Sequence, residues 1–284
     1  MREYQKSGGF DWKQFYIRRV LRIFPCFYFY ILVILALAHF GWITVTDRTI
    51  LAASTFTLNY HHLWDPWPAG LDYPVIGHYW TLALEEQFYL TWPLLMVLFA
   101  WRKLVATLAG FIVIAPVIRI ACYFLAPDSR PQIGMMFHTA FDSIAAGVLL
   151  GELLRNPDTR AKLQNLAANR WILAHSHPLS GHCVSASRPL FQGAYSITVG
   201  KSLDLICVGL VLIAAVSQPG TLLFRFLNWR PLAYVGVLSF SLYVWNNLFL
   251  NGETGWGVNA FPLNLVCCNR NGPLLLLPDR EAVS

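Results

Sequence analysis

The chain has 284 residues, of which 56% are hydrophobic and 13% are charged, and its mean hydropathy is +0.48. So apolar a composition excludes a protein that buries all of its hydrophobic side chains in one soluble core, and we expect a bilayer to act as its solvent. The formal charge of +6 is spread over short segments between apolar runs. This distribution indicates membrane topology and contact with anionic headgroups, and it argues against nucleic acid as a partner.

Six apolar runs, each near the twenty residues that a bilayer crossing needs, follow one another along the chain. They cover residues 24–45, 79–100, 104–125, 135–154, 195–216 and 232–250. A shorter run at 50–60 suits a buried or interfacial helix better than a crossing. The sequence therefore predicts an all-α, polytopic membrane helix bundle of six to seven spans. We expect a membrane domain over residues 1–251 and an irregular tail over 252–284.

Basic residues predict the orientation of these spans, because loops rich in Lys and Arg stay in the cytoplasm. The residues before the first span hold six of them, and the turns at 102–103 and 155–170 are basic again, whereas residues 46–77 contain only Arg48. This alternation predicts a multi-pass protein of the cell (inner) membrane with a cytoplasmic N-terminus. After residue 170 the alternation continues only if residues 171–190 contain a further crossing.

Three arginines, Arg18, Arg19 and Arg22, precede the first apolar run. Helical spacing places Arg18 and Arg19 about one turn from Arg22. Guanidinium groups paired at a membrane edge can hold a phosphate or pyrophosphate, which a nucleotide-linked acyl donor offers. The same arginines also suit an anchor that grips lipid headgroups, and the spacing alone favours the anchor.

Two carboxylates, Glu85 and Glu86, lie about two turns inside the second apolar run. A charge there requires a partner, a proton or a wet cavity. Successive helix residues diverge by about 100°, so the two glutamates cannot line the same wall. Because Glu85 shares a face with Tyr89 and Trp92, we expect Glu85 to face a cavity and Glu86 a structural partner. Glutamates that snorkel to the interface or form a structural ion pair are the alternative.

Arg119 and Asp142 are the other charges deep in apolar runs, and we expect them to neutralise each other between neighbouring helices. His138, one helical turn before Asp142, offers a His–carboxylate proton relay as an alternative. No Asp, Glu or Cys falls at a zinc-motif spacing beside the three histidines of residues 175–182. We therefore expect no metal site.

Two stretches, residues 15–25 and residues 78–93, resemble the acyltransferase-3 family of multi-span O-acyltransferases that modify cell-surface polysaccharides and related glycans. Residues 142–147 and 238–245 resemble two later segments of that family. The residues that carry the strongest part of the resemblance are Trp80, Glu85, Glu86, Gln87, Phe88, Tyr89, Trp92 and Pro93. The resemblance implies transfer of an acyl group, usually acetyl, from acyl-CoA as donor substrate to a hydroxyl of a glycan acceptor, with no bound cofactor.

The resemblance also assigns roles to particular residues. It implies that Arg19 and Arg22 help to bind acyl-CoA at the cytoplasmic face and that Glu85 or Glu86 belongs to the functional cavity. We expect Arg18 to join the two arginines and the glutamates to be catalytic. We expect Trp80, Tyr89 and Asp142 to line the substrate cavity.

Several positions depart from the family pattern. Members usually begin with a further span that carries a histidine thought to act as the general base, and this chain starts after that span, so we expect an incomplete domain. Ala140 stands where a basic residue is usual, and Asn246 stands where a histidine is usual. Losing a general base commonly costs a factor of about 10² to 10⁴ in rate. No histidine of this chain visibly replaces that base, and His78, two turns before Glu85, is the nearest candidate for a catalytic substitute.

Two other interpretations belong to different classes of protein. One is a catalytically inactive remnant of such an enzyme, or a non-enzymatic membrane partner of an intact one. The other is a transporter, which is less favoured because intramembrane charges are few and no inverted repeat is visible.

Overall fold

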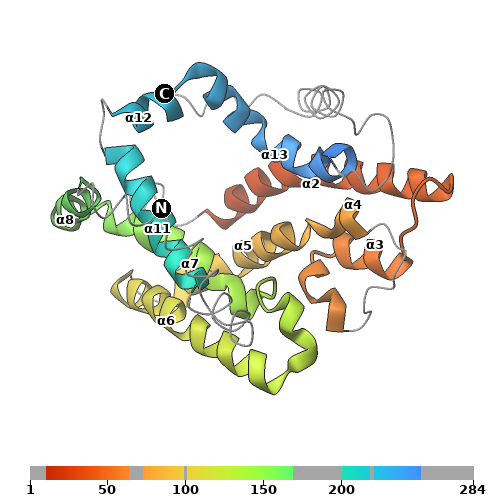
Figure 1. The fold of residues 1–284 in the computed structure, drawn as a ribbon, viewed down its shortest axis with the longest axis horizontal. Coiled ribbons are helices and arrows are strands. Elements are labelled where there is room, and N and C mark those ends of the chain that lie inside the picture. The colour runs from red at the N-terminus through yellow and green to blue at the C-terminus, as the bar shows by residue number, and fades with distance from the viewer. Residues whose placement is uncertain (1–10, 64–72, 99–100, 169–199, 218–220, 251–284) are drawn as a thin grey trace, which may run out of the picture. The chain divides into compact units, whose positions relative to one another are not determined.

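The computed structural model describes residues 11–63, 73–98, 101–168, 200–217 and 221–250 (Figure 1). Every regular element in these ranges is helical, which confirms the predicted all-α class. The chain divides into two compact units. The first comprises Met1–His61, Asp65–Trp80 and Tyr234–Ser284, and the second comprises His62–Trp64 and Thr81–Ala233. The predicted tail and the further crossing considered for residues 171–190 lie outside the described residues.

The first unit is built on α2 (Trp12–His39), which begins well before the predicted start of its apolar run at residue 24. Asp11 caps this helix, since its Oδ1 accepts a hydrogen bond of 3.0 Å from the Gln14 N–H. The buried positions recur every three or four residues: Ile23, Cys26, Phe27, Tyr30, Ile31 and Ile34. The arginines that precede the apolar run are therefore part of the same helix, as their helical spacing implied.

Short elements follow α2 in the first unit. The chain leaves α2 through a turn in which Gly41 adopts φ +73° and the Trp42 N–H bonds to the Leu37 carbonyl at 2.9 Å. Then come α3 (Asp47–Ser54), the 3-10 turn η1 (Leu58–Leu63) and α4 (Tyr73–Gly77). As predicted for the run at 50–60, these elements are too short to cross a bilayer. The last helix, α13 (Arg230–Leu250), contributes its residues from Tyr234 onward to this unit.

The second unit contains α5 (Trp80–Leu98) from Thr81 onward, α6 (Trp101–Leu125), the turn η2 (Pro127–Gln132), α7 (Phe137–Leu153), α8 (Pro157–Ala168), α11 (Lys201–Ser217) and α12 (Leu222–Leu227). Helix α6 packs along α7, and α11 packs against both α7 and α8 (Figure 1). The Phe141 ring lies against the rings of Phe88, Phe111 and Phe137, with centroid distances of 5.6, 5.1 and 4.9 Å. This aromatic contact joins α5, α6 and α7.

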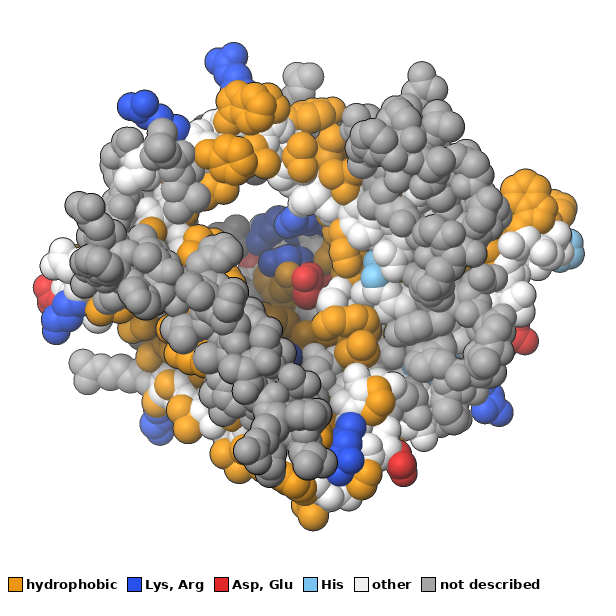
Figure 2. All heavy atoms as spheres, viewed as in Figure 1, with side chains coloured by type: hydrophobic (Ala, Val, Ile, Leu, Met, Phe, Trp, Pro, Cys, Tyr) orange, Lys and Arg blue, Asp and Glu red, His pale blue; other side chains and the backbone are white. Residues whose placement is uncertain are grey.

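Length and composition allow four stretches of the described residues to cross a membrane: Trp12–His39, Val105–Leu125, Pro127–Leu153 and Arg230–Phe249. The predicted runs at 79–100 and 195–216 are also helical, as α5 with 19 residues and α11 with 17. Many large hydrophobic side chains are exposed on the long helices, and they form the orange areas of the surface in Figure 2. Such a surface suits lipid and not water. The chain is thus a polytopic helical membrane protein.

Candidate functional site

The first unit contains a buried cluster of aromatic and polar side chains around His78. The turn between α4 and α5 supplies His78 and Tyr79, α2 supplies Tyr30, and α13 supplies Tyr243 and Trp245. Tyr30 and Tyr79 are almost completely buried, with exposed fractions of 0% and 1%. The His78 ring centroid lies 4.3 Å from that of Tyr79 and 5.2 Å from that of Tyr243. The structure therefore surrounds the predicted substitute base with phenol rings.

Hydrogen bonds to backbone carbonyls hold this cluster together. The His78 Nε2 atom lies 3.3 Å from the Val244 carbonyl oxygen, so Nε2 carries a proton and donates it. In the opposite direction, the Tyr243 hydroxyl donates to the His78 carbonyl at 2.7 Å. The Tyr30 hydroxyl donates to the Val75 carbonyl at 2.6 Å. These bonds fasten the turn before α5 to α2 and α13.

The protonation state of His78 follows from its surroundings. This histidine lies outside the candidate membrane-spanning helices, and burial lowers its pKa to about 4, although hydrogen bonds with the Val244 and Tyr243 backbones oppose that shift. The imidazole is therefore neutral at pH 7.

Sequence analysis did not find Tyr30 or Tyr243, and the one available signal was the position of Tyr243 in the segment 238–245 that resembles the acyltransferase-3 family.

The predicted arginine group lies on α2. The Arg18 Nη1 atom donates to the Gln14 Oε1 atom at 3.2 Å, and the Arg19 guanidinium stands 5.6 Å from the centroid of the Phe15 ring. Arg22 is exposed and forms no hydrogen bond or ion pair with any residue that the structure describes. Arg22 can therefore reach an anion, while Arg18 and Arg19 are partly held by neighbours on their own helix.

The predicted glutamates lie on α5 in the second unit. Glu85 is exposed, whereas Glu86 is half-buried and its Oε1 atom is inaccessible. Trp80 and Tyr89 are half-buried. The assignment of Glu85 to a cavity and Glu86 to a structural partner stays a prediction. Within the described ranges no group of three or more His, Cys, Asp or Glu side chains could hold a metal, and the histidines of residues 175–182 lie outside those ranges.

The predicted ion pair between Arg119 and Asp142 is confirmed within the second unit. The Arg119 Nη1 atom lies 2.8 Å from the Asp142 Oδ2 atom, and both side chains are 0% exposed. Arg119 also donates to the Thr139 carbonyl at 2.7 Å and to the Ser202 Oγ atom at 3.2 Å. The Asp142 carboxylate pairs with Arg119 and makes no direct hydrogen bond with His138, and the alternative of a proton relay between them stays a prediction. Asp142, which the resemblance placed in the substrate cavity, is held by a buried ion pair.

The helices, the arginines of α2 and the glutamates of α5 define a class of protein. It is a polytopic helical membrane protein with arginines on its first long helix and carboxylates near the start of α5. The particular family follows from the sequence as a whole. The chain belongs to the acyltransferase-3 family, whose acyltransferase domain matches residues 4–268. This match confirms the resemblance seen in residues 15–25 and 78–93.

The curated relatives of this chain are longer than the chain itself. Peptidoglycan O-acetyltransferase OatA of Listeria monocytogenes is 28% identical over 264 residues, which cover 86% of this chain and 41% of the relative. O-acetyltransferase OatA of Staphylococcus aureus is 26% identical over 260 residues, covering 86% of this chain and 42% of the relative. The chain thus spans about two fifths of the length of these relatives. No solved structure is significantly similar to it.

Proposed function

We propose that this protein transfers an acyl group, most simply acetyl, from acyl-CoA to a hydroxyl of a cell-wall glycan, with peptidoglycan as the acceptor class. The observation that carries the proposal is the family match over residues 4–268, together with relatives that are named for O-acetyl transfer. The exposed arginines of α2 support the choice of donor, because CoA carries phosphate groups.

The reaction sets out what the protein must supply. The acceptor hydroxyl oxygen attacks the carbonyl carbon of the thioester, the carbon–sulfur bond breaks, and the departing thiolate takes up the proton that the hydroxyl gives away. Because a sugar hydroxyl is a poor nucleophile, a base must receive that proton first. A second requirement is a positive site that holds the CoA phosphates while the thioester is attacked.

Arg22 is the residue that we assign to the phosphate site. Its guanidinium is exposed on α2 and is not paired with any described residue. Arg18 lies one turn before Arg22 on the same face of the helix. Two guanidinium groups at this spacing can share one phosphate through charge-assisted hydrogen bonds. The basic loops favour a cytoplasmic N-terminus. In that orientation the arginines would lie on the cytoplasmic side of the membrane, where acyl-CoA is made.

His78, Glu85 and Glu86 are the candidates for handling the proton. Burial lowers the pKa of His78 to about 4, so the imidazole is unprotonated at neutral pH but is a weaker base than an ordinary histidine. Because Nε2 donates to the Val244 carbonyl, only Nδ1 of this ring could accept a proton. The glutamates are the alternative base, with Glu85 the more accessible of the two.

The test measures CoA release from acetyl-CoA by the full-length protein, purified in detergent, with and without soluble peptidoglycan fragments. We expect release that depends on the acceptor. An Arg22→Ala change should raise the KM for acetyl-CoA about 10- to 100-fold, as expected for losing a hydrogen bond to a charged group. Lys13→Ala is the matched control, because Lys13 is exposed near the start of the same helix.

Two results would count against the proposal. Absence of acceptor-dependent CoA release would favour a non-enzymatic membrane partner. Equal KM values for Arg22→Ala and Lys13→Ala would remove Arg22 from the donor site and leave it as a membrane anchor.

A further inference from the structure

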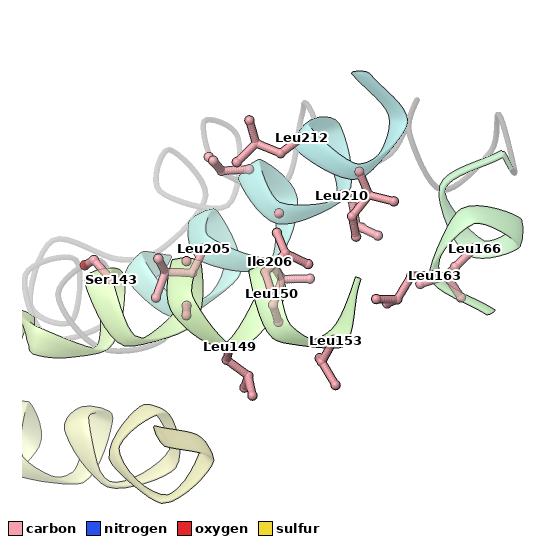
Figure 3. A pocket seen from close by; sticks show the side chains of 15 residues that line it. Ser143, Leu149, Leu150, Leu153, Leu163, Leu166, Leu205, Ile206, Leu210 and Leu212 are labelled. Carbon is pink, nitrogen blue, oxygen red and sulfur yellow. The ribbon is translucent and has the colours of Figure 1, made fainter. Parts of the chain in front are cut away.

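The second unit contains an apolar groove that the proposed reaction does not use (Figure 3). Helices α7, α8 and α11 enclose a volume of about 350 Å³, which is within the range of small-molecule sites. Its lining comes almost entirely from aliphatic side chains, among them Leu150 of α7, Leu163 of α8 and Leu210 of α11 (Figure 3). Ser143 is the polar exception. A polar ligand would find few partners here, whereas a hydrocarbon chain would fit.

Two glycines keep the groove open. Gly147 of α7 and Gly209 of α11 both line it. A Cβ atom added at Gly147 would meet nothing within 4 Å, and one added at Gly209 would meet only the Leu150 Cδ2 atom, at 3.9 Å. The helices therefore leave unfilled space beside these positions, and a larger side chain could occupy it.

Cations border the groove on α8. Arg160 lies one turn before Leu163, and Lys162 lies one turn before Leu166, and both leucines line the groove. At about 100° per residue, Arg160 and Lys162 lie on opposite edges of the apolar face that Leu163 and Leu166 form on α8. Both side chains are exposed, and neither forms an ion pair with a residue in the described part of the chain. Arg155 nearby is different, because it pairs with Glu152 at 3.1 Å.

We propose that this groove binds an acyl chain of an anionic membrane lipid whose head group is attracted by Arg160 and Lys162, the cations at the two edges of the apolar face of α8. The bilayer offers a ligand with this combination of an apolar chain and a negative head, and juxtamembrane cations attract anionic lipids. The apolar lining lies between the two cations of α8, so a lipid whose chain enters the groove carries its negative head group near positive charge at either edge. The proposal is independent of the acyl-transfer reaction and holds for an inactive protein as well.

The first experiment compares lipids that share acyl chains and differ in head group. Native mass spectrometry of the full-length protein in detergent measures the retention of phosphatidylglycerol and of phosphatidylcholine. We expect phosphatidylglycerol to be retained more tightly. A double change, Arg160→Ala with Lys162→Ala, should weaken its binding about thirty-fold, at roughly a five-fold loss for each cation. Lys103→Ala, at an exposed position on α6, should leave binding unchanged.

A second pair of variants tests the apolar part. Gly209→Leu should fill the groove and reduce the retention of both lipids. Gly110→Leu is the matched control, because Gly110 lies on α6, does not line the groove and has equally open space at its Cβ position. Equal retention of the two lipids, no effect of the double change, or equal effects of the two glycine variants would each overturn the proposal. The surface charge variants keep the test valid if Gly209→Leu does not fold.

Discussion

Replacing Arg119 by methionine should lower the free energy of unfolding of the second unit much more than a substitution at the protein surface does. The substitution keeps an unbranched side chain of similar length, so the effect on packing is small. It removes the partner of the Asp142 carboxylate, whose side chain is 0% exposed, and it removes the donors to the Thr139 carbonyl and the Ser202 hydroxyl. An ionised carboxylate without a partner in a low-dielectric interior strongly destabilises the folded state.

The magnitude follows from comparing one broken partner with two. Removing one member of a buried ion pair typically costs 3–5 kcal/mol, so we expect a loss of about 4 kcal/mol for Arg119→Met or for Asp142→Leu. Removing both leaves no buried charge, and apolar replacements of a buried pair are often neutral. The stability of the double variant should therefore lie within about 2 kcal/mol of that of the original protein. Its loss of stability should be far smaller than the sum of the two single losses.

The measurement is the free energy of unfolding in mixed micelles, titrated with a denaturing detergent. Arg155→Met, just after the end of α7, is the control, because Arg155 pairs with Glu152 at 3.1 Å while its side chain is 38% exposed. An exposed pair of this kind should contribute at most about 1 kcal/mol. The reasoning fails if the single variants at 119 and 142 match Arg155→Met, or if their losses simply add in the double variant.

Three further predictions concern the first unit and are read by thermal unfolding. Tyr243→Phe removes the 2.7 Å bond to the His78 carbonyl and should cost about 1 kcal/mol, and an unchanged midpoint would contradict it. Burial holds the folded-state pKa of His78 near 4, against 6.5 when unfolded, so stability should be full above pH 6.5 and fall by up to about 3 kcal/mol toward pH 4. His78→Gln should flatten this slope. Gly41→Ala should cost about 1 kcal/mol from its φ of +73° alone, because a Cβ there meets nothing within 4 Å.

Much of the fold could be predicted because hydropathy is a local property of the sequence. Each of the six predicted runs contains a helix, and the break between α6 and α7 falls between the predicted runs at 104–125 and 135–154. For the same reason, hydropathy alone does not locate the start of α2. Hydropathy sees polar residues before Phe24 and ends the element there, whereas the backbone continues to Trp12, where Asp11 caps the helix.

The buried cluster around His78 could not be predicted, because its bonds join residues far apart in the chain. Tyr243 is 165 positions from His78, and Tyr30 is 45 positions from Val75. The acceptors are backbone carbonyls, which every residue carries, so no residue type marks them in the sequence. A phenol in an apolar run signals only that it needs a partner, and the tertiary fold decides which carbonyl accepts.

Arg119 and Arg22 show what separates a structural charge from a functional one. Arg119 lies deep in an apolar run with an opposite charge on the next helix, so pairing is the only inexpensive outcome, and the sequence was sufficient to predict it. Arg22 lies at the edge of an apolar run, where water or headgroups can solvate it, so the spacing alone favours a membrane anchor and does not reveal a donor site. The two arginines should therefore respond differently to removal. Arg119→Met should reduce stability, whereas Arg22→Ala should change donor binding and leave the unfolding midpoint in place.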